Sequence, residues 1–382
     1  MTLTPVPDSP APLAVSAERI ANTVVELVST PSPVGFTDNI VRLVCGKLDA
    51  MGAEYELTRR GAIRVNLKGR KSSPDRAVAG HVDTLGAQVK MLKENGRLEL
   101  VAIGHWSSRF AEGARVTIFT DDGPRRGTIL PLKASGHTYN KEIDTQPVDW
   151  RQLEIRVDEI VKNRRDLEEL GFNIGDIVSI DAQPELTPAG FINSRHLDDK
   201  GGVAAMLEAL RVIHEAGDSI SLPIDCHFLF TISEEVGSGA SAVLHGDVSE
   251  LVSVDNGTPA PGQNSSEFGV TIGMADQTGP FDYHLTRHLI GLSKDHAIEH
   301  QREVFRFYRC DAASAVEAGN DIRTALITFG VDASHGYERT HIHSLESIAR
   351  LLTIYVQSDA VADRDRHELH TLEGFPEQPA AE

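Results

Sequence analysis

The hydrophobic pattern of this chain changes its period twice, and this change constrains the fold more than any other feature. Apolar residues recur at helical spacing over residues 16–30 and 37–52, and strand-like runs follow at 62–69 and 76–83. From about Gly86 to Ala182 the pattern shifts to short alternating strands, with turn residues such as DDGPRRG between them. From about Leu186 long helical patterns and buried strand patterns alternate again. The sequence therefore predicts one α/β sheet domain that is interrupted by a small, mostly β domain.

This pattern also predicts where the domains begin and end. Residues 1–14 are rich in proline, and we expect a disordered N-terminal tail there. The C-terminal stretch is polar, and we expect a flexible tail. The predicted division is listed by residue number: N-terminal tail 1–14, first part of the α/β domain 15–86, inserted β domain 87–183, second part of the α/β domain 184–361, and C-terminal tail 362–382.

Charge and composition exclude several classes of partner. The 382 residues carry a formal net charge of −19, which repels nucleic acid backbones and anionic lipid surfaces. No segment approaches the ~20 apolar residues that span a bilayer, and the N-terminal stretch lacks the pattern of a secretory signal. The three cysteines are odd in number and far apart, which favours free thiols in a reducing compartment. We therefore expect a cytoplasmic protein with no nucleic acid or membrane partner.

Acidic and histidine side chains follow several separate strand patterns. In open α/β sheets the carboxyl ends of the strands line the ligand crevice, so these residues should meet at one edge of the sheet. The candidates are His81, Asp83, Asp198, Asp199, Glu234, Glu235, Asp255 and a late histidine in the segment 332–344. Mixed imidazole and carboxylate ligands suit zinc, cobalt or manganese. Each residue alone is more often a solvated surface group, and only their joint placement favours a metal site.

So many carboxylates in one crevice need positive charge, and two divalent cations would supply it. Two such ions are well served by one bridging carboxylate, and Asp198 is the candidate for the bridge. His81 and Asp255 would complete one ion, and Glu235 with the late histidine the other. Asp83 could orient the His81 imidazole.

The stretch TISEEVGSGA then assigns different roles to its two adjacent glutamates. Glu235 would bind a cation, while Glu234 would take a proton from water. Neighbouring side chains of a regular strand face opposite ways. Both glutamates can converge only in a loop, which Gly237 and Gly239 permit.

Several motifs together resemble a known family. The stretches GHVDTLG, HLDDKGG, TISEEVGSGA, SVDN and CDAASAVEAG, in this order, resemble the M42 family of dinuclear metalloaminopeptidases. The segment 96–132 looks like the family's β-barrel insertion. The resemblance covers roughly Val15 to Ala360 and implies a zinc-exopeptidase-like catalytic domain. In this domain helices cover both faces of a mixed sheet, and the inserted β-barrel serves oligomerisation and substrate access.

The resemblance also implies a set of site residues. It implies Glu234 as general base and Asp83 as the support of His81. The family's last ligand is a histidine followed by serine, which His343 matches, with His335 and His341 as competitors. The implied metal ligands are His81, Asp198, Glu235, Asp255 and His343. They would hold two divalent ions, with zinc favoured over cobalt or manganese.

The expected function is hydrolysis of the N-terminal peptide bond of short peptides, in a homo-oligomer between a dimer and a dodecamer. One alternative is an amidase or deacylase acting on N-blocked small peptides. The sequence looks closest to a branch of the family linked to an osmoprotectant system based on an acetylated glutamine dipeptide. A second alternative is a catalytically silent assembly protein, although the ligand set is retained.

Overall fold

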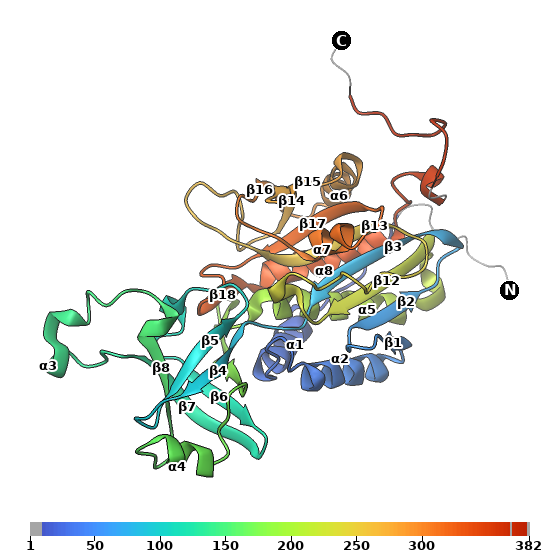
Figure 1. The fold of residues 1–382 in the computed structure, drawn as a ribbon. Coiled ribbons are helices and arrows are strands. Elements are labelled where there is room, and N and C mark those ends of the chain that lie inside the picture. Colours follow the sequence, from blue (N-terminus) through green and yellow to red (C-terminus); the bar gives the residue numbers. More distant parts are fainter. Residues whose placement is uncertain (1–9, 367–368, 380–382) are drawn as a thin grey trace.

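The structure is a computed structural model that describes residues 10–366 and 369–379. It has two parts, a large α/β unit and a smaller β-barrel that projects from it (Figure 1). The predicted fold class, a mixed-sheet α/β domain interrupted by a small β-barrel, is confirmed. Among the described helices, none is long and apolar enough to cross a membrane.

The large unit is built on a nine-stranded sheet. Its strand order is β1-β2-β12-β3-β13-β17-β14-β15, and β16 pairs with β14 outside this path. The strands are β1 (Tyr55–Leu57), β2 (Ile63–Leu67), β3 (Lys71–His81), β12 (Ile224–Thr231), β13 (Val248–Gly257), β14 (Val270–Asp276), β15 (Gly279–Pro280), β16 (His300–Val304) and β17 (Arg323–Gly330).

The four central strands β12, β3, β13 and β17 run parallel to one another. Thr231 lies opposite His81, and Gly257 lies opposite Gly330, so these strands end at the same edge of the sheet. Every residue of β12 is buried, which explains why its sequence is a continuous apolar run and does not alternate. The residues that follow these parallel strands therefore lie close together at this edge of the sheet.

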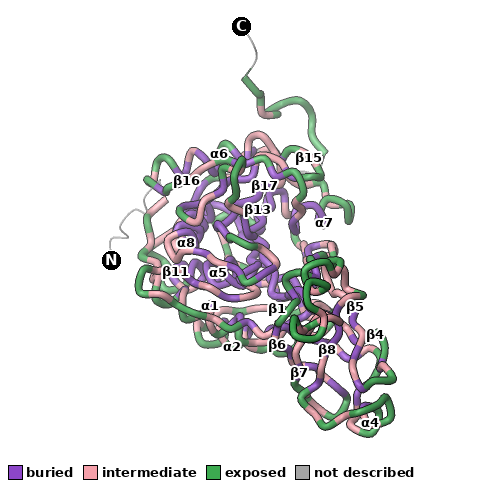
Figure 2. The backbone as a smooth tube through the Cα atoms, turned by 90° about the vertical axis from the view of Figure 1, so that its left-hand side faces the viewer, coloured by how far each residue is buried: buried purple, intermediate pink, exposed green. Residues whose placement is uncertain are grey.

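Helices cover both faces of this sheet. They are α1 (Ala17–Ser29), α2 (Asp38–Met51), α5 (Leu197–Ala216), α6 (Tyr283–Asp295), α7 (Asp311–Glu317) and α8 (Ile342–Gln357). Helix α5 packs on α1, α8 and β13, whereas α7 lies on the opposite face against β13 and β17 (Figure 1). Ser16 caps α1 by accepting a hydrogen bond from the Arg19 amide, and Gly52 ends α2 in the left-handed conformation. Figure 2 shows the buried backbone concentrated in the sheet and in α5 and α8.

The barrel has its own hydrophobic core. Its six strands close in the order β4-β5-β8-β7-β6-β9. They are β4 (Gly86–Leu92), β5 (Leu98–Ile103), β6 (Arg115–Thr120), β7 (Gly123–Pro131), β8 (Leu153–Val157) and β9 (Ile177–Ile180). Alternate residues such as Val116, Ile118 and Ile155 point inward and are buried in a cluster separate from that of the large unit. The helices attached to the barrel are α3 (Gly136–Tyr139) and α4 (Arg164–Glu169).

Short elements complete the described chain. A three-stranded sheet joins β10 (Glu185–Leu186), β11 (Phe191–Ser194) and β18 (Glu338–His341). The 3-10 helices are η1 (Ser108–Phe110), η2 (Asn140–Glu142), η3 (Trp150–Gln152), η4 (Gly217–Ser219), η5 (Glu234–Val236) and η6 (Asp363–Arg366). Cys45, Cys226 and Cys310 are buried free thiols, as predicted.

The predicted domain limits 14, 86, 183 and 361 remain a proposal. Both predicted tails fall partly outside the described residues, at 1–9, 367–368 and 380–382. In the described part of the N-terminal stretch, Ala11 exchanges two hydrogen bonds with the Gln357 side chain of α8, at 3.0 and 2.9 Å.

A buried ion pair anchors the middle of strand β3. Arg76 lies within 3.7 Å of Glu250 on β13, and both side chains are buried. The Tyr355 hydroxyl donates to the Glu250 carboxylate at 2.9 Å, and the Val361 amide donates to its other oxygen at 2.6 Å. Arg76 also donates to the Tyr355 carbonyl. This network ties β3, β13 and α8 together and thereby fixes the strand whose far end carries His81.

We predict that Glu250→Ala lowers the free energy of unfolding by about 3–5 kcal/mol, because it leaves the Arg76 charge buried without its partner. Urea unfolding followed by far-UV circular dichroism measures this change. The control is Glu215→Ala, whose side chain is 63% exposed beside Arg211 and should cost less than about 1 kcal/mol. Equal losses in the two variants would contradict the anchoring role of Glu250.

Candidate active site

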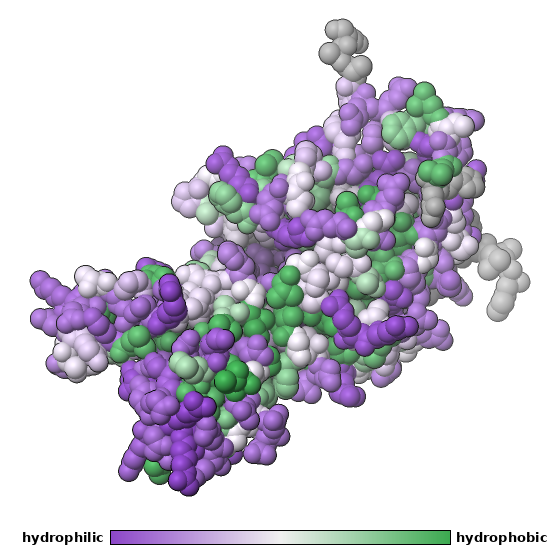
Figure 3. Space-filling model, in the orientation of Figure 1, coloured by the Kyte–Doolittle hydropathy of each residue, from purple (hydrophilic) through white to green (hydrophobic). Residues whose placement is uncertain are grey.

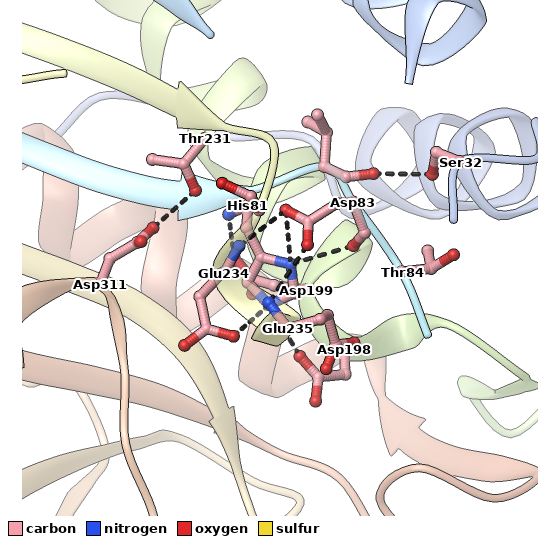
Figure 4. Close-up of polar contacts among 12 residues, drawn as sticks. Ser32, His81, Asp83, Thr84, Asp198, Asp199, Thr231, Glu234, Glu235 and Asp311 are labelled. Atoms are coloured by element: carbon pink, nitrogen blue, oxygen red, sulfur yellow. Dashed lines mark hydrogen bonds and ion pairs between the residues drawn. The ribbon is translucent and has the colours of Figure 1, made fainter. Parts of the chain in front are cut away.

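The structure brings the predicted acidic residues and His81 together at the carboxyl edge of the parallel strands. Figure 4 shows His81, Asp198, Glu234 and Glu235 lying close together. His81 is the last residue of β3, Asp198 lies in the first turn of α5, and Asp255 lies near the end of β13. Glu234 and Glu235 form the 3-10 turn that follows β12. Each residue therefore reaches the site from a different element, as the strand order requires.

The ligand atoms lie close enough to share a cation. Potential ligand atoms of His81, Asp198 and Glu235 lie within 4.8 Å of one another, and so do those of His81, Glu234 and Asp255. His81 Nε2 is 3.1 Å from Asp198 Oδ1 and 3.8 Å from Glu234 Oε2. His81 thus belongs to both groups, and the two groups form one continuous cluster.

The late histidine in this cluster is His335. Its Nε2 lies 3.2 Å from Asp198 Oδ2 and 3.8 Å from Glu235 Oε2. His343 lies elsewhere, because the first turn of α8 directs it to the Gly269 amide at 3.3 Å and to Glu299. His341 contacts the Ala189 carbonyl through Nε2. The structure therefore places His335 in the cluster and His343, the histidine chosen from the sequence, outside it.

Both clustered histidines present the same nitrogen to the carboxylates. His81 Nδ1 donates to the Asp83 carbonyl at 3.0 Å, and His335 Nδ1 donates to the His105 carbonyl at 2.9 Å. With Nδ1 as the donor, Nε2 faces Asp198 in each case, so a protonated ring donates from Nε2 to the carboxylate and a neutral ring with its proton on Nδ1 would offer the Nε2 lone pair to a metal. This is the tautomer in which an imidazole ligates a metal through Nε2.

Asp83 supports the site in a way that differs in part from the prediction. Its carboxylate accepts hydrogen bonds from the backbone amides of Glu234 and Glu235, each at 3.2 Å (Figure 4). The His81 ring is oriented by the Asp83 backbone carbonyl, while the Asp83 carboxylate lies 3.7 Å from it. Asp83 therefore holds the glutamate turn with its side chain and His81 with its backbone.

The glutamate turn depends on two glycines. Gly237 ends the turn with φ of 82°, in the left-handed region that glycine adopts without strain. A Cβ on Gly239 would lie 1.9 Å from Asp311 Oδ1, so only glycine fits there. These glycines let both carboxylates converge, as the sequence analysis predicts.

Two supporting residues escaped sequence analysis. Asn256 donates through Nδ2 to Asp198 Oδ2 at 2.6 Å and to Asp255 Oδ1 at 3.2 Å. Glu338 accepts from the amides of Asp198 and His335, which links the start of α5 to the histidine loop. Asn256 stands in the quoted SVDN motif and could have been found there, whereas Glu338 carries no signal in the sequence.

Burial and mutual repulsion perturb the protonation of this cluster. Burial, with the nearby Asp198 charge, raises the pKa of Asp255 to about 7. Burial likewise raises the pKa of Glu234 and of Glu235 well above the usual range, and neighbouring carboxylates add to this effect. Burial lowers the pKa of His335, but its hydrogen bond to Asp198 and the charge of Glu235 outweigh this and raise it to about 10. The cluster therefore holds more carboxylates than the positive charges of His81 and His335 can neutralise.

The residues present fit divalent cations. The donors are imidazole nitrogen and carboxylate oxygen, the set that zinc and similar metals prefer. Asp199 Oδ1 and Asn256 Oδ1 are buried with no hydrogen-bond partner among the described residues. A cluster of acidic groups with unsatisfied buried oxygens is better suited to a bound cation than to a closed network of hydrogen bonds.

A cavity of about 1050 Å³ opens above the cluster. Asp198, Glu234, Glu235, Asp255 and His335 line its inner end. Its walls come from the barrel residues 104–105 and from the segment 305–309 that precedes α7. In Figure 3 the molecule is hollowed where the barrel meets the large unit. The cavity has room for a small peptide.

Comparison with known proteins now identifies the family. The family model described as M42 glutamyl aminopeptidase matches residues 61–351. YhfE of Bacillus subtilis is 40% identical over 348 residues, which cover 91% of this chain and 99% of YhfE. Lysyl aminopeptidase of Pyrococcus furiosus is 27% identical over 215 residues, or 56% of this chain and 58% of that protein.

Solved structures share the fold. The TET aminopeptidase of a marine sediment Thaumarchaeota archaeon has a TM-score of 0.80 at 20% identity, covering 88% of this chain and 96% of that one. The TET1 peptidase of Pyrococcus horikoshii has a TM-score of 0.77 at 20% identity, covering 88% of this chain and 99% of that one. Fold and site together define a peptidase with side chains arranged to bind metal. The chain belongs to the M42 peptidase family, as its motifs predict.

The two histidines 335 and 343 offer a matched test of the cluster. We expect His335→Ala to weaken zinc binding, because it removes a proposed ligand. The loss should exceed the roughly 10–100-fold that is typical when only the hydrogen-bond partner of a ligand is removed. His343→Ala should leave affinity unchanged. Isothermal titration calorimetry with zinc measures both, and the reverse ranking would show that the histidine loop adopts another arrangement.

Proposed function

We propose that this protein is a dinuclear metal-dependent aminopeptidase that cleaves the N-terminal peptide bond of short peptides. The observation that carries the proposal is the convergence of His81, Asp198, Glu235, Asp255 and His335, all of which except His81 line the cavity. Glu234 lies beside them and is left for proton transfer. The proposed metal ligands differ from the sequence-based set only in having His335 in place of His343.

Asp198 is the proposed bridge between two cations. Its Oδ1 faces His81 Nε2, and its Oδ2 faces His335 Nε2, so its two oxygens serve two separate imidazoles. Asp255 would join His81 in one ligand group, and Glu235 would join His335 in the other. We propose zinc for both positions, with cobalt or manganese as the alternatives. Bound there, the ions would lower the pKa of water and polarise the scissile carbonyl.

Glu234 is the proposed general base. Its carboxylate reaches within 3.8 Å of His81 Nε2, and its side chain is 13% exposed where it lines the cavity. Burial raises its pKa above the usual range, so its proton affinity suits uptake of a proton from the attacking water. The same carboxyl then returns the proton to the leaving amine. Asp83 keeps Glu234 in place through the backbone amide.

The acidic character of the inner cavity supports a substrate with a free amino terminus. A protonated amine is attracted by carboxylates in a partly buried site, whereas an acetylated amine carries no charge. The barrel residues and the segment 305–309 enclose the cavity, which favours short peptides over folded proteins. A deacylase of N-blocked peptides would use the same centre, and an osmoprotectant role on an acetylated glutamine dipeptide stays a prediction. The intact ligand set argues against a catalytically silent assembly protein.

We also propose a cytoplasmic homo-oligomer. The support is the likeness to TET1 of Pyrococcus horikoshii, which can assemble into a tetrahedron or a large octahedral shell. The barrel projects from the large unit and offers surface for such contacts (Figure 1). Free buried thiols fit a reducing compartment.

Glu234→Gln tests the general base. We expect kcat to fall by about 10²–10⁴-fold or more, because an amide cannot accept the proton. Zinc content, measured by plasma mass spectrometry, should stay at the wild-type level, since Glu234 is not a proposed ligand. A variant that retains a tenth of wild-type turnover would exclude Glu234 as the base.

Substrate class is tested with the same protein on paired peptides. Wild-type enzyme should cleave dipeptides and tripeptides with a free amine, lose activity on chelation, and regain it with zinc. Cleavage confined to the N-acetylated partners would favour the deacylase. Failure to cleave any peptide in the presence of metal would favour a silent assembly protein.

A further inference from the structure

One wall of the cavity carries a tyrosine that the proposed reaction has not used. The segment Phe305 to Arg309 connects β16 to the short helix α7, and its residues line the cavity opposite the barrel. Tyr308 sits in this segment and lines the same cavity as Glu234 and Asp255.

The Tyr308 hydroxyl is buried and lies near the Asp255 carboxylate, but it makes no hydrogen bond of good geometry to any described residue. Buried tyrosine hydroxyls usually find a partner, and an unsatisfied buried polar group costs about 1–3 kcal/mol. A hydroxyl kept in such a state beside a cavity is explained when its partner is a bound molecule.

The rest of Tyr308 is held firmly. Its ring packs on the Phe305 ring, with centroids 4.9 Å apart, and its backbone carbonyl accepts from the Gln277 amide at 3.1 Å. The phenol lies close enough to Asp255, Asp198 and Glu234 for their charges to act on it. The hydroxyl is therefore fixed beside the reaction centre and is not mobile at the surface.

A hydrogen-bond donor at this place would add to the charge stabilisation that the proposed cations would supply. When water attacks the peptide carbonyl, a C–O bond forms and the carbonyl π electrons move to oxygen, which becomes an oxyanion. Ionised carboxylates cannot donate to it. The Asn256 amide already donates to Asp198 and Asp255, and Arg309 pairs with Glu317 at 2.8 Å. A phenol keeps its proton at neutral pH and can donate it in a hydrogen bond.

We propose that Tyr308 is a further catalytic residue whose hydroxyl donates a hydrogen bond to the oxyanion. This inference rests on the proposed aminopeptidase function. Tyr308 keeps its own proton throughout. Glu234 takes the proton of water and returns it to the amine as the C–N bond breaks and the carbonyl re-forms.

Tyr308→Phe removes this hydroxyl and leaves the ring that packs on Phe305. We expect kcat to fall by about 10²–10³-fold, the usual cost of losing one oxyanion donor. KM should change by less than about threefold, because the hydrogen bond forms only in the transition state. A phosphonate dipeptide analogue, which is tetrahedral and anionic, should bind more weakly by a factor similar to the loss in kcat, measured by calorimetry. The product amino acid should bind as before.

Tyr283→Phe is the matched control, because Tyr283 lies on α6 and stacks on Arg287 away from the cavity. It should match wild type in kcat and in phosphonate affinity. If wild type itself cleaves no peptide, the proposed function fails and this inference falls with it. If wild type is active and Tyr308→Phe equals it in kcat and phosphonate affinity, only the inference is overturned. A loss of zinc or of melting temperature that accounts for the loss in kcat would also overturn it, in favour of a structural role.

Discussion

Repulsion among buried carboxylates is the constraint on which the site depends. Asp198 is 5% exposed, Asp255 3% and Asp199 0%, and Glu234 and Glu235 share their surroundings. At an effective dielectric constant of 20, two like charges 4 Å apart repel by about 4 kcal/mol. His81 and His335 offset only part of this, and the raised pKa values of Asp255, Glu234 and Glu235 express the remainder. Two divalent cations would be attracted by the same carboxylates that repel one another, so the clustered negative charge would favour metal binding.

The fold is organised to hold this arrangement against its own charge. Parallel β3, β12, β13 and β17 end at one edge, so the backbone of the sheet fixes the spacing of the groups. Asp83 binds the two amides of the glutamate turn, and Glu338 joins the histidine loop to α5. In the middle of β3, the buried pair of Arg76 and Glu250 anchors the strand. Tertiary structure thus determines where each charge sits.

Sequence patterns could predict the parts that local rules control. The change of hydrophobic period predicts the barrel, and the position of His81, Asp198, Glu235 and Asp255 after strands predicts their convergence, because parallel strands end together. The late histidine could not be predicted in this way. Its loop has positive φ at Ala333 and His335, and strand β18 pairs with the distant β11. That long-range pairing carries His335 into the site and His343 out of it. The surroundings of the Tyr308 hydroxyl likewise depend on how a distant segment folds back over the cavity.

The proposed centre would hold two cations, with the Asp198 carboxylate as a shared ligand. Anomalous diffraction at the zinc absorption edge, from crystals grown with zinc, tests it most directly. We expect two peaks in this cluster, one beside His81 and one beside His335, at the roughly 2.0–2.3 Å ligand distances that are typical of zinc. Absence of zinc between these histidines, or a peak at His343 in their place, would contradict it.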